Sequence, residues 1–196
     1  MVRKKVERSD LMKATESLLR EKGYDGFSFS ALALRIGVGR STLYDHFSSK
    51  EELIVACMTD VMEKMMVECE QLSQCEDACS QIKGMVRTFH TYSQIHQLVQ
   101  SMPALKKASA RSERIAEALE QLAKDHHRLM ELLTNAFEKA KEQGSVRQDA
   151  PTSLLASMVF HSILLPNVEN LPEERWSELI FDLLYQGIQR HESDLD

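Results

Sequence analysis

A short segment that begins at Arg40 gathers polar side chains suited to contacts with nucleic acid. Arg40 can donate two hydrogen bonds to the O6 and N7 atoms of guanine, and Thr42 can offer a base its hydroxyl or its methyl group. Hydroxyl, imidazole and ammonium groups nearby suit contacts with phosphate oxygens, which position a protein on DNA without reading its sequence. The predicted DNA-contacting residues are Ser28, Ser30, Arg40, Ser41, Thr42, Tyr44, His46 and Lys50.

Two short helices joined by a tight turn must position these side chains. Leu32, Ile36 and Leu43 have the spacing of a small shared core, and Ala33 is small where two helices would touch. Gly37 can adopt the positive φ that such a turn needs. This pattern predicts a helix-turn-helix, whose second helix lies in the major groove of DNA.

Apolar residues recur at helical spacing through nearly the whole chain, which predicts an all-α fold of about nine helices. Gly23 is expected to end the first helix as a left-handed cap, and Ser28 or Ser30 to cap the second. Ser49 and Glu52 have the spacing of a capping box, in which Glu52 reaches back to the backbone of Ser49. A long helix should follow, to about Leu72.

Further helices are expected over 78–89, over 115–140 with Gly144 closing it, from Pro151 to Pro166, and over 173–190.

Three runs of the first 53 residues carry a family signature. They are Gly23-Tyr-Asp-Gly-Phe-Ser-Phe, Leu32-Ala33, and the segment from Ile36 to Leu53 with its Thr42-Leu-Tyr-x-His-Phe-x-x-Lys50-Glu-x-Leu53 run. Together they resemble the DNA-binding domain of the TetR (tetracycline-repressor-like) family.

That resemblance implies a homodimeric, usually repressing transcription factor that leaves DNA when a small molecule binds its helical C-terminal domain. Gly39 and Ser41 depart from the family pattern, which usually has Ser or Thr at the first position and Gly, Ala or Pro at the second. An operator sequence therefore cannot be transferred from a relative.

The charge of the chain is unevenly distributed. The net formal charge is −6, yet residues 1–50 carry 10 Lys and Arg against 6 Asp and Glu. Residues 51–196 carry 14 against 24. We expect a DNA-binding domain at 1–50 and an acidic effector-binding and dimerisation domain at 51–196, which faces away from the duplex.

The helix expected before Pro166 is apolar nearly all round, so it must be covered on both sides. A partner copy, paired about a two-fold axis with the help of the last helix, would supply that cover. The alternative is a central helix buried within one chain. The predicted dimer interface is Leu155, Met158, Val159, Ile163, Trp176, Ile180 and Leu184.

Methionines and aromatic residues of the middle helices could line an adaptable pocket for a hydrophobic or amphipathic small ligand. The alternative is that these side chains are ordinary core. The predicted ligand-binding residues are Met62, Met65, Met66, Met85, Phe89, Tyr92, Met102 and Met130.

Other classes have weaker support in the sequence. Cys75 and Cys79 are the candidates for a thiol- or metal-responsive regulator of the same fold, but no metal-ligand spacing occurs, so neither a metal nor a cofactor is expected. An enzyme is not expected, because no Gly-rich phosphate loop or nucleophile elbow is present. A helical protein-interaction module without DNA is the remaining alternative.

The expected partners are a double-stranded, palindromic DNA operator, a second copy of the chain and a small-molecule effector. The longest apolar run, Leu53 to Met58, is far too short to span a membrane, so a cytoplasmic protein without a membrane partner is expected.

Overall fold

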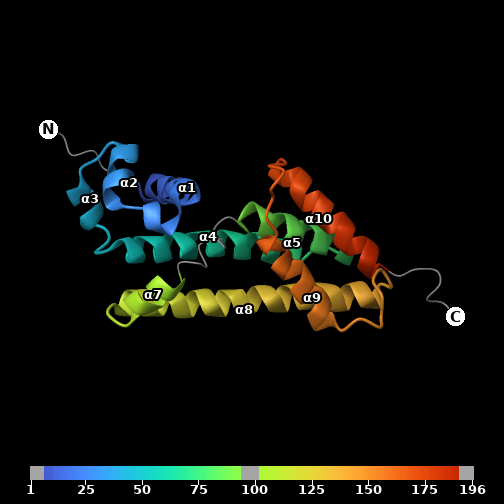
Figure 1. Ribbon diagram of the computed structural model, residues 1–196. Helices are drawn as coiled ribbons and strands as arrows, with labels where there is room; N and C mark the ends of the chain where they lie inside the picture. The colour runs from blue at the N-terminus through green and yellow to red at the C-terminus, as the bar shows by residue number, and fades with distance from the viewer. Residues whose placement is uncertain (1–6, 94–101, 190–196) are drawn as a thin grey trace. The chain divides into compact units, whose positions relative to one another are not determined.

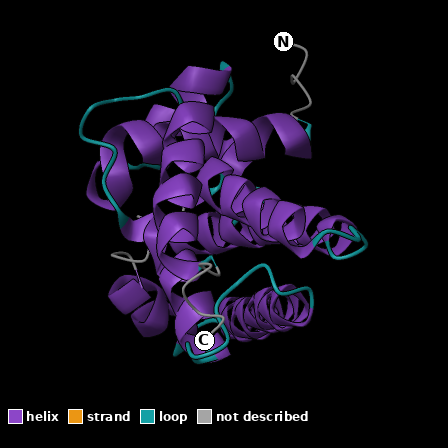
Figure 2. Ribbon diagram, turned by 90° about the vertical axis from the view of Figure 1, so that its right-hand side faces the viewer, coloured by secondary structure: helices purple, strands orange, loops and turns teal. Residues whose placement is uncertain are grey.

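A computed structural model describes residues 7–93 and 102–189, which form nine α-helices and one short 3-10 helix (Figure 1). Within these ranges there is no β-strand, as Figure 2 shows, and only an isolated antiparallel bridge joins Val146 and Gln189. The predicted all-α fold class is therefore confirmed. No helix of the described ranges combines the length and the apolar character that crossing a membrane requires.

The described residues divide into two compact units. Residues 7–62 and 102–123 form the first unit, and residues 63–93 and 124–189 form the second. Helices α4 (Lys50–Leu72) and α8 (Glu113–Glu142) each contribute residues to both units. The predicted domain boundary after residue 50 lies at the start of α4 and stays a prediction.

Three helices open the first unit: α1 (Arg8–Gly26), α2 (Phe29–Ile36) and α3 (Arg40–Tyr44) (Figure 1). Gly23 has a φ of +65°, as predicted, but one further helical turn follows it, so α1 is kinked there instead of ending. Of the two possible caps of α2, Ser28 is the one used, because its Oγ accepts a hydrogen bond from the backbone N–H of Ala31 at 3.2 Å.

A small apolar core holds these three helices together. Leu18, Phe27, Leu32 and Leu43 are each no more than 2% exposed, and Ala33 is 4% exposed. Burial of a Leu or Phe side chain contributes about 1.5–3 kcal/mol, so these few residues supply most of the stability available to helices this short. The predicted core of the helix-turn-helix is confirmed for Leu32, Ala33 and Leu43, whereas Ile36 is half-buried.

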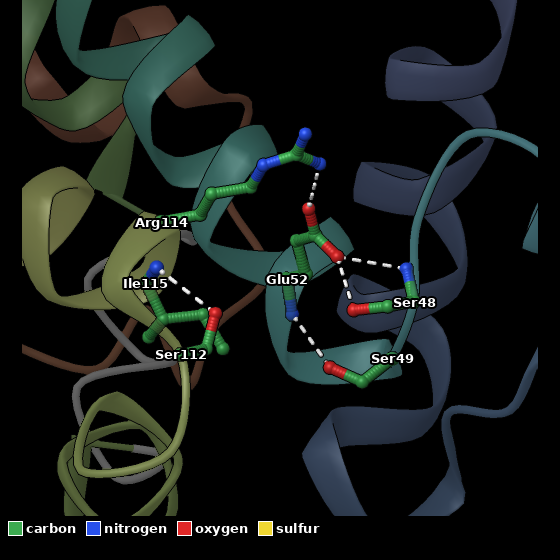
Figure 3. Close-up of polar contacts among 6 residues, drawn as sticks. All are labelled: Ser48, Ser49, Glu52, Ser112, Arg114 and Ile115. Carbon is green, nitrogen blue, oxygen red and sulfur yellow. Dashed lines mark hydrogen bonds and ion pairs between the residues drawn. The ribbon is translucent and has the colours of Figure 1, made fainter.

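The start of α4 is anchored by Glu52, which Figure 3 shows in detail. The Oγ of Ser49 accepts the backbone N–H of Glu52 at 3.2 Å, which confirms one half of the predicted capping box. The other half is wrong by one residue: the Glu52 carboxylate accepts from the backbone N–H of Ser48 at 2.7 Å and from its hydroxyl at 2.5 Å. The Arg114 guanidinium, from α8, donates to the second carboxylate oxygen at 3.1 Å.

Helix α7 (Met102–Ser109) completes the first unit, next to the start of α8 (Figure 1). The second unit also contains α5 (Ala78–Thr91), α9 (Thr152–His161), the 3-10 helix Ser162–Leu164 and α10 (Glu173–Ile188), with α10 packed along α5. The helix expected up to Pro166 therefore ends as an α-helix at His161. Gly144, with a φ of +69°, follows α8 as predicted.

We predict that Glu52→Gln destabilises the protein by about 1 kcal/mol at neutral pH, because the uncharged amide is a weaker acceptor and the site is partly open to solvent. Burial raises the pKa of Glu52, but the hydrogen bonds from Ser48 and the Arg114 charge outweigh it, so the pKa lies below the ordinary 4.5. The difference in unfolding free energy between the wild type and the variant should be complete above the ordinary pKa. It should be lost as the pH falls through the lowered pKa.

Urea unfolding of both proteins between about pH 7 and about pH 3.5 measures this difference. The control is Glu63→Gln, an exposed position of the same helix, which should be neutral throughout. A Glu52→Gln effect that persists unchanged at low pH would contradict the role given to the carboxylate.

Candidate nucleic-acid interface

The turn before α3 is built by glycine and by one buried leucine. Gly37 lies in the left-handed region, with φ 71° and ψ 41°, and closes α2. Its neighbour Val38 donates its backbone N–H to the carbonyl oxygen of Ala33 at 3.0 Å, which brings the chain back toward α2. Leu43 is 0% exposed, so the inner side of α3 points into the core and its other side faces solvent.

The solvent-facing side of α3 and the following turn carries the residues predicted to contact DNA. Arg40, Ser41, Tyr44 and His46 are exposed, whereas Thr42 is half-buried. Five of the eight predicted DNA-contacting residues therefore lie on one short segment.

Tyr44 is both packed and accessible. Its ring lies edge-on to Phe29, with centroids 4.9 Å apart, yet the residue is 51% exposed. The Cζ atom of Arg40 lies 6.0 Å from the centroid of the same ring, which is a weak cation–π contact. Phe29 thus holds Tyr44 in place, and Tyr44 limits the orientations open to Arg40.

Some arginine side chains of the first unit form ion pairs with acidic side chains, and one does not. Arg35 donates to Glu21 and, at 3.0 Å, to Ser17, and the Arg35 hydrogen bond and charge lower the pKa of Glu21. Arg20 pairs with Glu16 at 2.9 Å. By contrast, Arg40 has no acidic partner within the described ranges, so its guanidinium is available to a ligand.

The other predicted DNA contacts lie at helix starts. Ser28 and Ser30 are exposed at the start of α2, and the Ser28 hydroxyl proton stays free to donate while its oxygen caps the helix. Lys50 is half-buried, with its Nζ 4.0 Å from the centroid of the Tyr24 ring and 3.5 Å from the Tyr24 carbonyl oxygen. Its ammonium group is thus held at the junction of α1 and α4.

Tyr24 fixes that junction. Its hydroxyl donates to a Glu51 carboxylate oxygen at 2.8 Å. Burial, reinforced by the hydrogen bond to Glu51, raises the pKa of Tyr24 to about 12, so the phenol stays protonated and the contact persists at physiological pH.

Half of the eight predicted effector residues are core residues. Met62, Met65, Met85 and Phe89 are buried, and the Phe89 ring packs edge-on to Phe160 with centroids 5.6 Å apart. Met66, Tyr92 and Met130 are half-buried, and the side chain of Met102 lies outside the described residues. The Tyr92 hydroxyl donates to Glu68 at 2.7 Å.

The predicted dimer residues fall into two groups. Leu155, Val159, Ile163 and Ile180 are buried by their own chain, so they are core residues of the protomer. Trp176 and Leu184 are half-buried, and Met158 is 44% exposed. The exposed apolar residues of this region that lie outside the predicted interface set are Leu154, Leu164, Leu165, Val168 and Leu183.

The cysteines differ in accessibility. Cys57 and Cys69 are buried, and burial raises the pKa of the Cys69 thiol to about 12, which makes it unreactive. Cys75 and Cys79 are half-buried, and the Cys79 thiol lies 3.5 Å from the Tyr185 hydroxyl. Within the described residues, no three His, Cys, Asp or Glu side chains come together as a metal site.

Sequence reasoning missed a cleft in the first unit, between the start of α4 and the α7–α8 region. It is lined by Tyr24, Ser48, Ser49, Glu51, Ala104, Lys107, Ala108, Arg111, Ser112 and Ile115. No signal in the sequence could place residues 104–115 beside residues 48–51, because only tertiary packing joins them.

Comparison with known proteins agrees with this geometry. Residues 11–57, which run from α1 into α4, match the family model of bacterial regulatory proteins of the tetR family. No curated protein sequence matches the chain.

Several solved structures share the fold over nearly the whole chain. The ketosteroid transcriptional regulator KstR2 of Mycobacterium tuberculosis is 14% identical, with a TM-score of 0.71 over 97% of this chain and 100% of that one. The TetR family regulator PfmR from Thermus thermophilus is 21% identical, with a TM-score of 0.70 over 94% and 100%.

A third structure contains ligands. AibR, in complex with isovaleryl coenzyme A and operator DNA, is 17% identical, with a TM-score of 0.64 over 90% of this chain and 97% of that one. The similarity to the tetR family is therefore a match of residues 11–57 to its family model, and the described chain shares the fold of these three solved structures.

Proposed function

We propose that this protein is a DNA-binding transcriptional regulator, a repressor that leaves its operator when a small hydrophobic ligand binds the C-terminal helices. The observation that carries the proposal is the exposed face of α3, where Arg40 lies without an acidic partner among the described residues on a helix that a buried leucine holds in place. Such a face suits the major groove of DNA.

The exposed groups divide into two roles. Arg40 and Thr42 read bases, because a guanidinium matches the acceptors of guanine and a threonine can contact a base through its hydroxyl or its methyl group. Ser28, Ser30, Ser41, Tyr44, His46 and Lys50 hold phosphates and fix the register of the protein on the duplex.

The charge distribution supports this orientation. Residues 1–50 carry an excess of four basic side chains, whereas residues 51–196 carry an excess of ten acidic ones. The basic part attracts the duplex and the acidic part weakens sequence-independent binding, so discrimination depends on the few contacts of α3.

The exposed apolar residues of the second unit support a two-fold homodimer. Met158 and Leu183 line a shallow cleft of about 310 Å³ between α9 and α10, with Leu154 and Leu184 beside them. Leu183 is 68% exposed and Leu164 is 61% exposed, which is costly for a lone protomer and favourable for an interface. A dimer would present two copies of α3 to a palindromic operator.

An effector site in the C-terminal helices is supported by the fold. AibR has the same fold and was solved with an acyl-coenzyme A and with operator DNA. The methionine-rich core around Met65 and Met85 can repack around an apolar guest at modest cost. We therefore propose a hydrophobic or amphipathic effector, and a protein that acts in the cytoplasm, where bacterial DNA lies.

The test of DNA recognition is selection of bound DNA from a random pool, followed by affinity measurements at several salt concentrations. Arg40→Ala should relax the preference at one base step and cost about 1–3 kcal/mol of binding free energy on the selected site.

Lys50→Ala should instead weaken binding to all DNA sequences alike and reduce the salt slope by about 0.9 per lost phosphate contact.

Arg175→Ala, at an exposed position of α10, is the matched control. It should change neither the base preference nor the salt slope of DNA binding. Equal losses on all sequences for Arg40→Ala would refute its base-reading role. Failure of the wild-type protein to select any DNA would favour a protein-interaction module.

We predict that Met158→Glu combined with Leu183→Glu converts the dimer to a folded protomer, because two charges cannot be buried in an apolar interface without partners. Sedimentation should show a dimerisation Kd raised at least about 100-fold, and operator affinity should fall with it.

Val67→Glu is the control, because Val67 is also apolar and 50% exposed but lies on α4. It should leave the dimer intact. A dimer that survives the double substitution would place the interface elsewhere.

A further inference from the structure

The cleft in the first unit has a volume of about 470 Å³. One wall is formed by Tyr24 at the end of α1 and by Ser48, Ser49 and Glu51 at the start of α4. The other wall is formed by α7 and the turn that leads to α8. The cleft therefore lies against the segment that connects the three N-terminal helices to α4.

Two exposed cations, Lys107 and Arg111, border the cleft. Neither has an acidic partner in residues 7–93 or 102–189. Glu51 is the one carboxylate of the lining, and its Oε1 atom already accepts the Tyr24 hydroxyl at 2.8 Å. The cleft thus has a net positive lining, with its negative group already engaged.

Hydroxyl groups of the lining are arranged to donate. The Ser49 oxygen accepts the Glu52 backbone N–H at 3.2 Å, and the Ser112 oxygen accepts the Ile115 N–H at 3.5 Å. Each hydroxyl proton then remains available to a guest. Two cations and two hydroxyl donors match the lone pairs of a carboxylate or a phosphate group.

The remaining lining is small and apolar. Ala104 and Ala108 leave space on α7, and Ile115 is 3% exposed. A guest with a short aliphatic part next to its anionic head would bury apolar surface here as well as form ion pairs.

We propose that this cleft binds a small organic anion, with Lys107 and Arg111 holding its carboxylate or phosphate head and Ser49 and Ser112 donating to it. The site is separate from the methionine-rich core proposed for the hydrophobic effector. Its regulatory consequence rests on the proposed function: a guest here contacts the residues that hold the helix-turn-helix.

The contacts around Glu52 explain how a guest would affect DNA binding. Glu52 holds the backbone and side chain of Ser48, and Arg114 from α8 holds Glu52 (Figure 3). Ser48 and Ser49 belong to both this network and the cleft, whereas Ser112 lines the cleft and accepts a hydrogen bond from Ile115 on α8, the helix that carries Arg114. An anion at Ser49 would contact the α3–α4 connection directly, so we expect it to weaken operator binding, and by linkage operator DNA would then weaken anion binding by the same factor.

Calorimetry with octanoate and octyl phosphate tests the site, with 1-octanol as the uncharged probe of the same tail. We expect the protein to bind at least one of the two anions, and Lys107→Gln/Arg111→Gln to weaken that binding at least about tenfold. The preferred anion distinguishes a carboxylate guest from a phosphate guest. Lys106→Gln, an exposed lysine of the same helix outside the cleft, is the matched control and should bind like the wild type.

Equal affinity of the wild type and the double variant for both anions, or no binding of either anion, would overturn the proposal. If the double variant lost as much affinity for 1-octanol as for the anions, the proposal would also be overturned, because such a loss would indicate disrupted packing. A reduced salt slope of DNA binding without a change in anion binding would assign Lys107 and Arg111 to DNA phosphates instead.

The same titrations with operator DNA present separate this proposal from the proposed function. Anion binding that depends on Lys107 and Arg111 in a protein that selects no DNA would keep the site and reject the regulator. Operator binding by a protein that binds neither anion would keep the regulator and reject the anion site.

Discussion

A five-residue helix cannot hold its own shape in water, and everything that α3 presents to a ligand depends on the burial of Leu43. Isolated helices shorter than about 12 residues are marginally stable, because a few hydrogen bonds do not offset the unfavourable free energy of helix nucleation. Packing of Leu43 into the small core with Leu32 and Phe27 replaces the missing length. Arg40 and Tyr44 have a defined direction only because that small core exists.

The same dependence extends to the start of α4. The chain leaves α3 through Phe47, which is 7% exposed, and enters α4 through a cap in which Glu52 satisfies the backbone of Ser48. Tyr24 and Glu51 tie the end of α1 to this cap. The three N-terminal helices are therefore fixed at two points of α4, so a change at either point alters the presentation of α3.

Much of this could be predicted from the sequence because it is local. A glycine at a position that requires positive φ, such as Gly37, or a serine that caps a helix, such as Ser28, acts within four residues of itself. The cap of α4 shows the limit of this reasoning. The Glu52 carboxylate binds Ser48 instead of Ser49, because the conformation of the preceding turn decides which N–H points at the carboxylate.

Helical spacing also identified apolar stripes in 152–166 and 173–190, but it could not say which side of each helix is buried within the protomer. Leu155 and Ile180 are buried, while Leu164 and Leu183 are exposed.

By itself, the sequence determined the all-α class, the helix-turn-helix and the polar face of α3, since periodicity, capping and turn residues act over short distances. Only the tertiary structure decided that Arg114 meets Glu52 and that Lys107 and Arg111 border the same cleft as Ser49. Arg114 and Glu52 are 62 residues apart in the chain, and the packing of whole helices, which no short-range pattern encodes, brings such residues together.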